Sequence, residues 1–309
     1  MVVNDFVVKI KFAMVFHWSI GAISAGFLVG ELFRIVLKRL LPSGYYAYAN
    51  ELISTFQLSV CVFEISVIGK FYSSWIALSC TFVLLALKHA EFIFEGAFAN
   101  PCGMLEDIVY KKAYWVKENI AKVIFQLIGG LLSFPFIQFL WQSTWSEFHF
   151  QQVKKGLRST LEVSLLYGIS IEIMATFVTT MSDFMSRGHA LKKFNSVIRA
   201  ASAVVVSYAL AETTGTWMNP ALATAQTFVY CTRKEVISEH LFVFWLGPVI
   251  GTMAAIVLNS LLTWKPKPVE IKPEKEYWGK KDSRSSVENH KNEELNPSEL
   301  KKRRKGTKS

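Results

Sequence analysis

Charged residues are scarce in this chain. Asp, Glu, Lys and Arg make up 19% of its 309 residues, hydrophobic residues make up 51%, and the mean hydropathy is +0.29. A soluble domain carries about 25% charge, and its apolar residues are broken into short stripes. Here the apolar stretches are nearly continuous. This excludes an ordinary water-soluble domain and indicates a membrane protein.

The chain also lacks the side-chain patterns of metal, disulfide and catalytic sites. Its four cysteines lie in or beside apolar stretches, and its histidines show no HxxxH or HExxH spacing. No nucleophile or acid–base cluster stands out. We therefore expect no metal, no cofactor and no enzymatic activity.

Seven apolar runs follow one another along the chain: 12–33, 52–69, 73–93, 119–141, 161–184, 196–211 and 240–264. A membrane span needs about 20 apolar residues. The first run either spans the bilayer, which makes seven spans, or lies flat, which makes six. Lys and Arg cluster in alternate connections, near residues 34–39, 111–117 and 187–193. These connections and the C-terminus are therefore predicted to be cytosolic.

The last 45 residues differ sharply from the rest. They are polar and interrupted by proline, and their 14 Lys and Arg against 8 Asp and Glu supply +6 of the chain's net charge of +10. We interpret residues 265–309 as a disordered basic tail. Because the positive charge is concentrated there, it does not indicate nucleic-acid binding.

An internal repeat is visible in the apolar part. Glu51 precedes Asn100 by 49 residues, and Glu172 precedes Asn219 by 47. Each asparagine is followed 26 residues later by Gln126 or Trp245, respectively, with glycines beyond. Three spans per unit require the two copies to be inverted relative to each other. Inverted repeats of this kind build transport pathways at the bilayer midplane.

These features predict an all-α membrane protein with the following organisation. The N-terminal segment covers 1–47, the channel core covers 48–264, and the tail covers 265–309. The two inverted units of the core are 48–141 and 168–264.

Two Asn-Pro pairs occupy corresponding places in these units, in "GAFANPCGML" and "TGTWMNPALATA". Asparagine caps helix N-termini, and proline is favoured at the first helical position. From Pro101 to Lys111 a helix would be about 15 Å long, and from Pro220 to Arg233 about 20 Å. Neither spans a hydrocarbon core of about 30 Å. We therefore expect two half-helices that meet N-terminus to N-terminus at the midplane.

Such a pair of helix ends carries about half a positive charge each. Each asparagine amide is expected to direct a donor into the pathway, where a neutral solute with oxygen acceptors is able to bind it. Cations are repelled. The predicted function is a narrow channel for small uncharged polar solutes.

The two motifs resemble the signature loops of the aquaporin family. "NELISTFQL" and "SIEIMATFV" are similar to that family's first and fourth helices, and "FWLGPVIG" to its sixth. The NPC variant, with "STFQLSVCVFE" upstream, resembles the unorthodox superaquaporins, the group of aquaporins eleven and twelve. The resemblance implies a six-helix bundle with two half-helices, a homotetramer in membrane lipid, and an intracellular location, notably the endoplasmic reticulum.

The resemblance also implies the residues of the site. The pore residues are Asn100, Pro101, Cys102, Asn219, Pro220 and Ala221. The constriction residues are Leu222, Thr216, Ser207 and Cys80, with Phe82 as the alternative to Cys80. Glu51 and Glu172 are expected to bind loop backbone amides; an interfacial glutamate is the other interpretation of Glu51. Glu106 and Asp107 are expected to complement the dipole of the first half-helix.

Two positions depart from the family pattern. Leu222 stands where ordinary aquaporins have an arginine, which favours permeation by hydrogen peroxide or glycerol besides water. Cys102 replaces an alanine, as either a small buried thiol or a reactive pore residue. A non-conducting protein of the same fold, with a structural role in an internal membrane, is the alternative function. A coupled transporter is disfavoured because the motif neighbours Ala99 and Met218 are uncharged.

Overall fold

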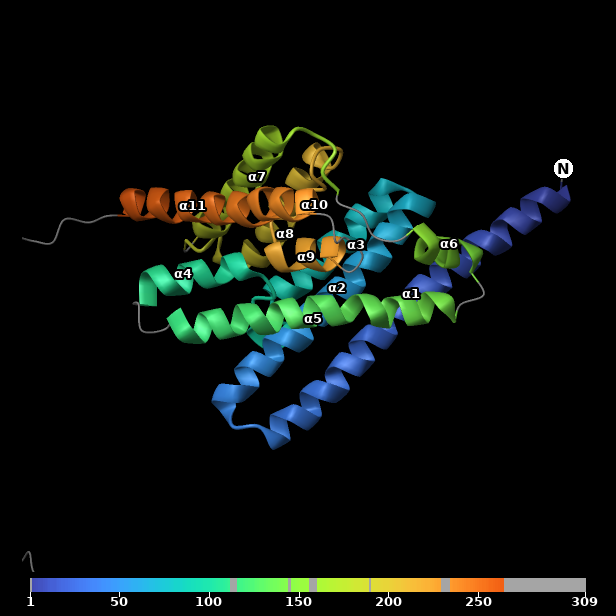
Figure 1. The fold of residues 1–309 in the computed structure, drawn as a ribbon, viewed down its shortest axis with the longest axis horizontal. Coiled ribbons are helices and arrows are strands. Elements are labelled where there is room, and N and C mark those ends of the chain that lie inside the picture. The colour runs from blue at the N-terminus through green and yellow to red at the C-terminus, as the bar shows by residue number, and fades with distance from the viewer. Residues whose placement is uncertain are drawn as a thin grey trace, which may run out of the picture. The chain divides into compact units, whose positions relative to one another are not determined.

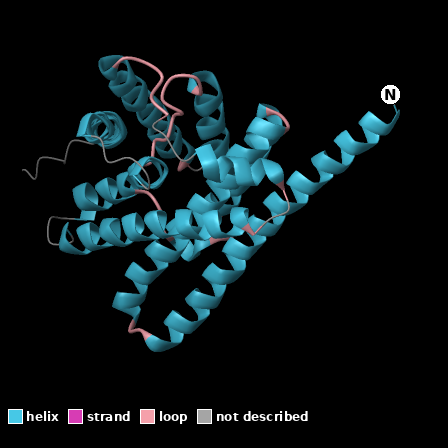
Figure 2. Ribbon diagram, turned by 45° about the vertical axis from the view of Figure 1, so that its right-hand side comes forward, coloured by secondary structure: helices cyan, strands magenta, loops and turns pink. Residues whose placement is uncertain are grey.

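The computed structural model describes residues 2–111, 116–143, 146–155, 160–188, 190–228 and 234–263, and every regular element in these ranges is a helix (Figure 2). The predicted tail lies outside the described residues.

The described residues from 2 to 142 form five α-helices (Figure 1). Four of them overlap predicted apolar runs, and α4 follows the first Asn-Pro motif. Their bounds are α1, Val2–Leu40; α2, Ser43–Phe71; α3, Ser74–His89; α4, Pro101–Lys111; and α5, Val116–Gln142. A 3₁₀ turn, η1 (Phe94–Gly96), lies between α3 and α4.

The second half repeats this order after a short helix that the sequence analysis does not predict. That helix is α6, Glu147–Lys155. Then follow α7, Leu165–Ser186; η3, Lys192–Phe194; α8, Asn195–Leu210; α9, Pro220–Phe228; α10, Lys234–His240; a π-helical segment, Leu241–Leu246; and α11, Gly247–Thr263.

Within the described residues, five helices are long and apolar enough to cross a membrane. They are Ala13–Leu40, Ser43–Phe71, Val116–Gln142, Leu165–Ser186 and Val236–Thr263. The helices α3 and α8 are shorter, with 16 residues each.

The two halves contain the same kind of close helix packing. α2 packs on α5, and α7 packs on α11. A Cβ atom on Gly129 of α5 would lie 2.1 Å from the Leu52 carbonyl oxygen, and one on Gly251 of α11 would lie 2.4 Å from the Ile173 carbonyl oxygen. Leu52 and Ile173 directly follow Glu51 and Glu172. The same glycine contact therefore occurs beside the same glutamate in both halves, as the repeat predicts.

The equal spacing of 26 residues between each asparagine and Gln126 or Trp245 does not identify equivalent positions. Gln126 donates to Glu51 Oε2 at 2.8 Å, whereas the Trp245 indole donates to Thr224 Oγ1 at 3.1 Å. The corresponding glycines lie 29 and 32 residues after their asparagines. The two halves thus differ in length by three residues in this region.

The long helix α1 packs along α2, to which a short turn joins it (Figure 1). The packing is close: a Cβ atom on Gly26 would lie 2.7 Å from Val60 Cγ1, and one on Gly30 would lie 2.4 Å from Gln57 Nε2. Glycines four residues apart are a common means of close helix approach in membranes. Val15 of α1 also belongs to the core cluster formed with α2 and α5.

Candidate functional site

Each Asn-Pro motif starts a half-helix, as predicted. α4 begins at Pro101 and α9 at Pro220. The Asn100 side-chain oxygen accepts a hydrogen bond from the Cys102 N–H at 3.0 Å, and the Asn219 oxygen accepts one from the Ala221 N–H at 3.1 Å. Each asparagine is therefore the N-cap of its helix.

The two loops also bind each other. Asn100 Nδ2 donates to the Met218 carbonyl at 3.1 Å, and Asn219 Nδ2 donates to the Ala99 carbonyl at 2.8 Å. This reciprocal pair joins the N-termini of α4 and α9. An amide NH₂ group has two donors, so each asparagine retains a second N–H beyond its loop contact.

The backbone before each asparagine adopts a left-handed conformation. Ala99 has a φ of 48° and Met218 a φ of 50°, and Thr216 has a φ of 51°. Residues with a Cβ atom adopt this region at a cost of about 1–2 kcal/mol each. Surrounding contacts must therefore hold these loops in place.

Two buried glutamates supply those contacts. Glu51 of α2 accepts hydrogen bonds from the Phe98 N–H at 3.0 Å and the Ala99 N–H at 2.9 Å. Glu172 of α7 accepts them from the Trp217 N–H at 3.0 Å and the Met218 N–H at 2.9 Å. The expectation that both carboxylates bind loop amides is confirmed, and the interfacial interpretation of Glu51, which is 3% exposed, is wrong.

A cavity of about 1170 Å³ passes the paired motifs. It is lined along α8 from Arg199 to Ala209, and the lining continues to Glu212 and Thr213 beyond the helix. Predicted residues that line it are Asn100, Cys102, Asn219, Leu222, Thr216 and Ser207. Pro101, Pro220 and Ala221 belong to the helix starts but not to the lining, and Ala221 is fully buried.

The two alternatives for the α3 constriction position do not reach this cavity. Cys80 packs in an apolar cluster with Leu58 and Leu84, and Phe82 lines a separate pocket between α3 and α8. Instead, Ala77 and Thr81 line the cavity from α3. Successive helical residues point about 100° apart, so an alignment shifted by one position selects the wrong face.

The cavity lining includes a charge cluster that the sequence motifs do not predict. Arg187 forms ion pairs with Glu106, across two helices, and with Asp183 at 2.7 Å. Arg199 Nε lies 3.3 Å from Asp183 Oδ1, and all four residues line the cavity with Lys88. Glu106 therefore does more than complement the α4 dipole. The hydrogen bond to Glu106 raises the pKa of the Arg187 guanidinium, which stays charged.

The i, i+4 spacing of Asp183 and Arg187 was the available signal for part of this cluster. Its partners Glu106 and Arg199 come from distant parts of the chain. Only the packing of α4 against α11 and of α7 against α8 brings them together.

The chain is similar in sequence to several known proteins. The family model described as "Major intrinsic protein" matches residues 70–258, more than half of the chain. Aquaporin-12 of Mus musculus is 29% identical over 238 residues, which are 74% of this chain and 80% of that protein. Aquaporin-11 of Mus musculus is 24% identical over 249 residues, 80% of this chain and 90% of that protein. The solved aquaglyceroporin of Plasmodium falciparum covers 79% of this chain and 97% of its own, at 15% identity and a TM-score of 0.40.

Proposed function

Because the chain belongs to the major intrinsic protein family and is a multi-pass membrane channel protein, we propose that it conducts water and small neutral solutes through the cavity at Asn100 and Asn219. The observation that carries the proposal is the reciprocal asparagine pair, whose side chains both line the cavity. Each retained N–H is a fixed donor for a passing oxygen acceptor.

The proposed permeants include hydrogen peroxide and glycerol besides water. Leu222, in the first turn of α9, lines the cavity, and so do the hydroxyl-bearing Thr216 and Ser207. An aliphatic side chain has no hydrogen-bonding group that would favour water over other small solutes. It also tolerates the carbon backbone of a small polyol.

The permeability test uses purified full-length chain in proteoliposomes, with stopped-flow osmotic shrinkage as the readout. Replacing Asn219→Asp removes the donor to Ala99 and places a carboxylate at the junction of the two helices. We expect fast shrinkage from the wild type and loss of at least about 90% of the added permeability in the variant, a loss that corresponds to about 1.4 kcal/mol.

Asn296→Asp is the matched control, because it makes the same change in a third Asn-Pro pair within the predicted tail. Vesicles that contain this variant should shrink as fast as those with the wild type. Peroxide and glycerol uptake are measured in the same vesicles. Wild-type vesicles no more permeable than empty ones to all three solutes would reject the channel proposal in favour of a non-conducting role.

For its setting, we propose a homotetramer in an internal membrane, notably the endoplasmic reticulum, with a cytosolic C-terminus. The resemblance to the superaquaporins motivates the proposed location, and the basic connections support the orientation. Cross-linking in intact membranes tests the tetramer. Protease protection of a C-terminal epitope tests the orientation.

A further inference from the structure

The turn η1, four residues before Asn100, has three successive residues in the left-handed region. Phe94 has a φ of 69°, Glu95 a φ of 44° and Gly96 a φ of 74°. Only glycine adopts this region without steric cost. A strained segment that leads directly into the first half-helix needs contacts that hold it.

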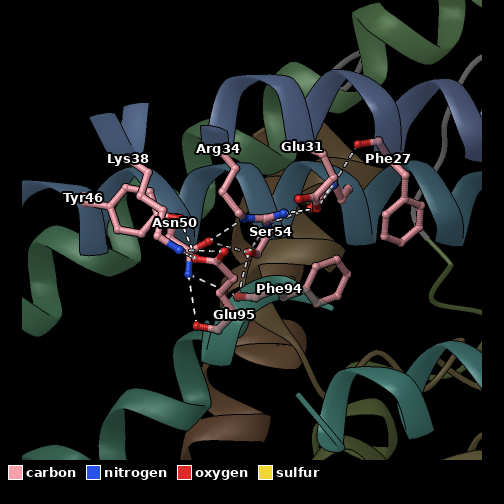
Figure 3. A network of polar contacts seen from close by, with 10 residues as sticks. Phe27, Glu31, Arg34, Lys38, Tyr46, Asn50, Ser54, Phe94 and Glu95 are labelled. Carbon is pink, nitrogen blue, oxygen red and sulfur yellow. Dashed lines mark hydrogen bonds and ion pairs between the residues drawn. The ribbon is translucent and has the colours of Figure 1, made fainter. Parts of the chain in front are cut away.

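Arg34 of α1 lies at the centre of those contacts, as Figure 3 shows. It is 2% exposed although it belongs to a basic cluster predicted to lie in a connection between spans. Its guanidinium donates to Asn50 Oδ1 at 3.0 Å, Ser54 Oγ at 3.1 Å and Gln57 Oε1 at 2.9 Å, and it forms an ion pair with Glu31. All three neutral acceptors are on α2.

Asn50 connects Arg34 to the turn η1. With Oδ1 held by Arg34, its Nδ2 group donates to the Phe94 carbonyl at 3.1 Å and to the Glu95 carbonyl at 3.4 Å. The ring of Phe27, also on α1, stacks on the Phe94 ring with 6.1 Å between centroids. The Arg34 hydrogen bond, with a longer one from Ser54 Oγ at 3.3 Å, therefore orients the Asn50 amide so that its Nδ2 group faces η1.

Lys38 of α1 and Tyr46 of α2 together hold the Glu95 side chain. Lys38 Nζ donates to Glu95 Oε1 at 3.0 Å, and the Tyr46 hydroxyl donates to Oε2 at 2.7 Å. Burial raises the pKa of the Glu95 carboxyl, but these hydrogen bonds outweigh it and leave the pKa below its ordinary value. Glu95 is therefore ionised at neutral pH.

We propose that α1 is a positioning element for the channel, and that Arg34 sets the position of the first half-helix through Asn50 and the strained turn Phe94–Gly96. The role of α1 in permeation rests on the proposed function, whereas its role in placing the loop does not. Arg34 is a positioning residue because its contacts are with α2 and Glu31, and it is not among the residues that line the cavity.

The test measures the modification of individual cysteines by methyl methanethiosulfonate in the purified full-length chain, with peptide mass spectrometry to resolve them. Cys102 lines the cavity two residues after Asn100 and reports the loop position. Cys61, 2% exposed inside α2, reports general loosening of the fold. Neither measurement requires permeation.

Arg34→Gln shortens the side chain and removes its charge. We expect Cys102 to react roughly 5- to 30-fold faster or slower than in the wild type, the factor for losing one or two charge-assisted hydrogen bonds, with Cys61 still protected. Arg39→Gln removes the same charge from an exposed position of the same helix and should change neither rate.

Lys38→Gln keeps the test decisive if Arg34→Gln loosens the fold. Lys38 is 58% exposed and contacts Glu95 and the Tyr46 ring, so its loss leaves the hydrogen bonds of the buried Arg34 in place. A smaller change in Cys102 reactivity in the Lys38 variant, with Cys61 protected, supports the proposal. The proposal is overturned if Lys38→Gln leaves the Cys102 rate unchanged and Arg34→Gln gives either of two results. These are an unchanged Cys102 rate, or faster modification of both Cys102 and Cys61.

Permeability of the same variants separates the two proposals. Vesicles of wild-type protein that are impermeable, with Cys102 reactivity changed as expected, would reject the channel and retain the positioning role. Permeable wild-type vesicles, with unchanged Cys102 reactivity in both variants, would retain the channel and reject the positioning role.

Discussion

At the scale of single residues, the site depends on two carboxylates buried where charge is expensive. Glu172 is fully buried and accepts three hydrogen bonds, from two backbone N–H groups and the Thr214 hydroxyl. Glu51 also accepts three, the third from Gln126. These bonds compensate part of the burial cost and fix a backbone that would otherwise relax from its left-handed conformation.

Glu172→Gln tests this role. The amide replaces one carboxylate oxygen by a donor that faces a backbone N–H, so we expect a loss of roughly 1.5–3 kcal/mol in the free energy of unfolding. Denaturant titration in detergent measures it. Glu147→Gln, at an exposed position of α6, is the matched control and should change stability by less than about 0.5 kcal/mol. Equal stability of the two variants would contradict the assigned role of Glu172.

At the scale of the elements, close glycine contacts set the helix spacing in both halves. The Cβ positions of Gly129 and Gly251 are blocked by backbone oxygens, which cannot rotate away as a side chain can. The helices α5 and α11 must therefore move bodily if either glycine is replaced. Such a movement would also displace Gln126, which helps to hold Glu51.

Gly251→Ala should destabilise the protein by about 1–3 kcal/mol, the usual cost of overpacking, and lower the permeability. Thermal unfolding in detergent and stopped-flow shrinkage measure the two effects. Gly21→Ala is the control, because no atom outside the local backbone of α1 lies within 4 Å of its Cβ position. It should be neutral or slightly stabilising. A Gly251 variant as stable as the Gly21 variant would show that α7 and α11 separate freely.

At the scale of the whole molecule, we expect the charges along the cavity to influence which solutes the proposed channel excludes. The charge cluster in the lining combines Arg187, Arg199 and Lys88 with the carboxylates Asp183 and Glu106. Asp183 forms ion pairs with both arginines, and Arg199 and Lys88 are close enough to repel each other. A positive potential inside a low-dielectric cavity raises the barrier for cations and leaves neutral solutes unaffected.

Lys88→Gln should therefore increase cation leakage while water permeability persists. We expect a rise of about tenfold in proton or sodium flux, measured with an ion-sensitive dye inside proteoliposomes, for a barrier lowered by about 1.4 kcal/mol. Lys192→Gln, on the exposed 3₁₀ turn η3, is the control and should not leak. Lys88→Gln vesicles as tight as those of the control would mean that another feature excludes cations.

Much of the fold was predictable from sequence because apolar length and helix capping are local properties. The seven apolar runs became helices, and both Asn-Pro pairs start half-helices. The carboxylate positions were also predictable, since a glutamate inside an apolar run is usually functional. In contrast, α6 was missed because it is short and polar.

The errors concern side-chain direction. The choice of Cys80 or Phe82 depended on an alignment of α3, and a shift of one residue turns a side chain by about 100°. Arg34 was grouped with loop charges because it follows an apolar run, yet four α2 and α1 side chains surround it. Neither could be decided without knowing which helix packs on which face.

The sequence by itself determined that this is a helical membrane protein with an inverted repeat and two capped half-helices. Periodicity, length and cap chemistry are properties of residues that are close together in the chain. Only the tertiary structure decided that Asn100 reaches Met218 and Asn219 reaches Ala99, which residues line the cavity, and that Arg34 connects α1 to the turn before Asn100. These contacts join residues that are far apart in the chain, and helix packing, not local preference, brings them within hydrogen-bonding distance.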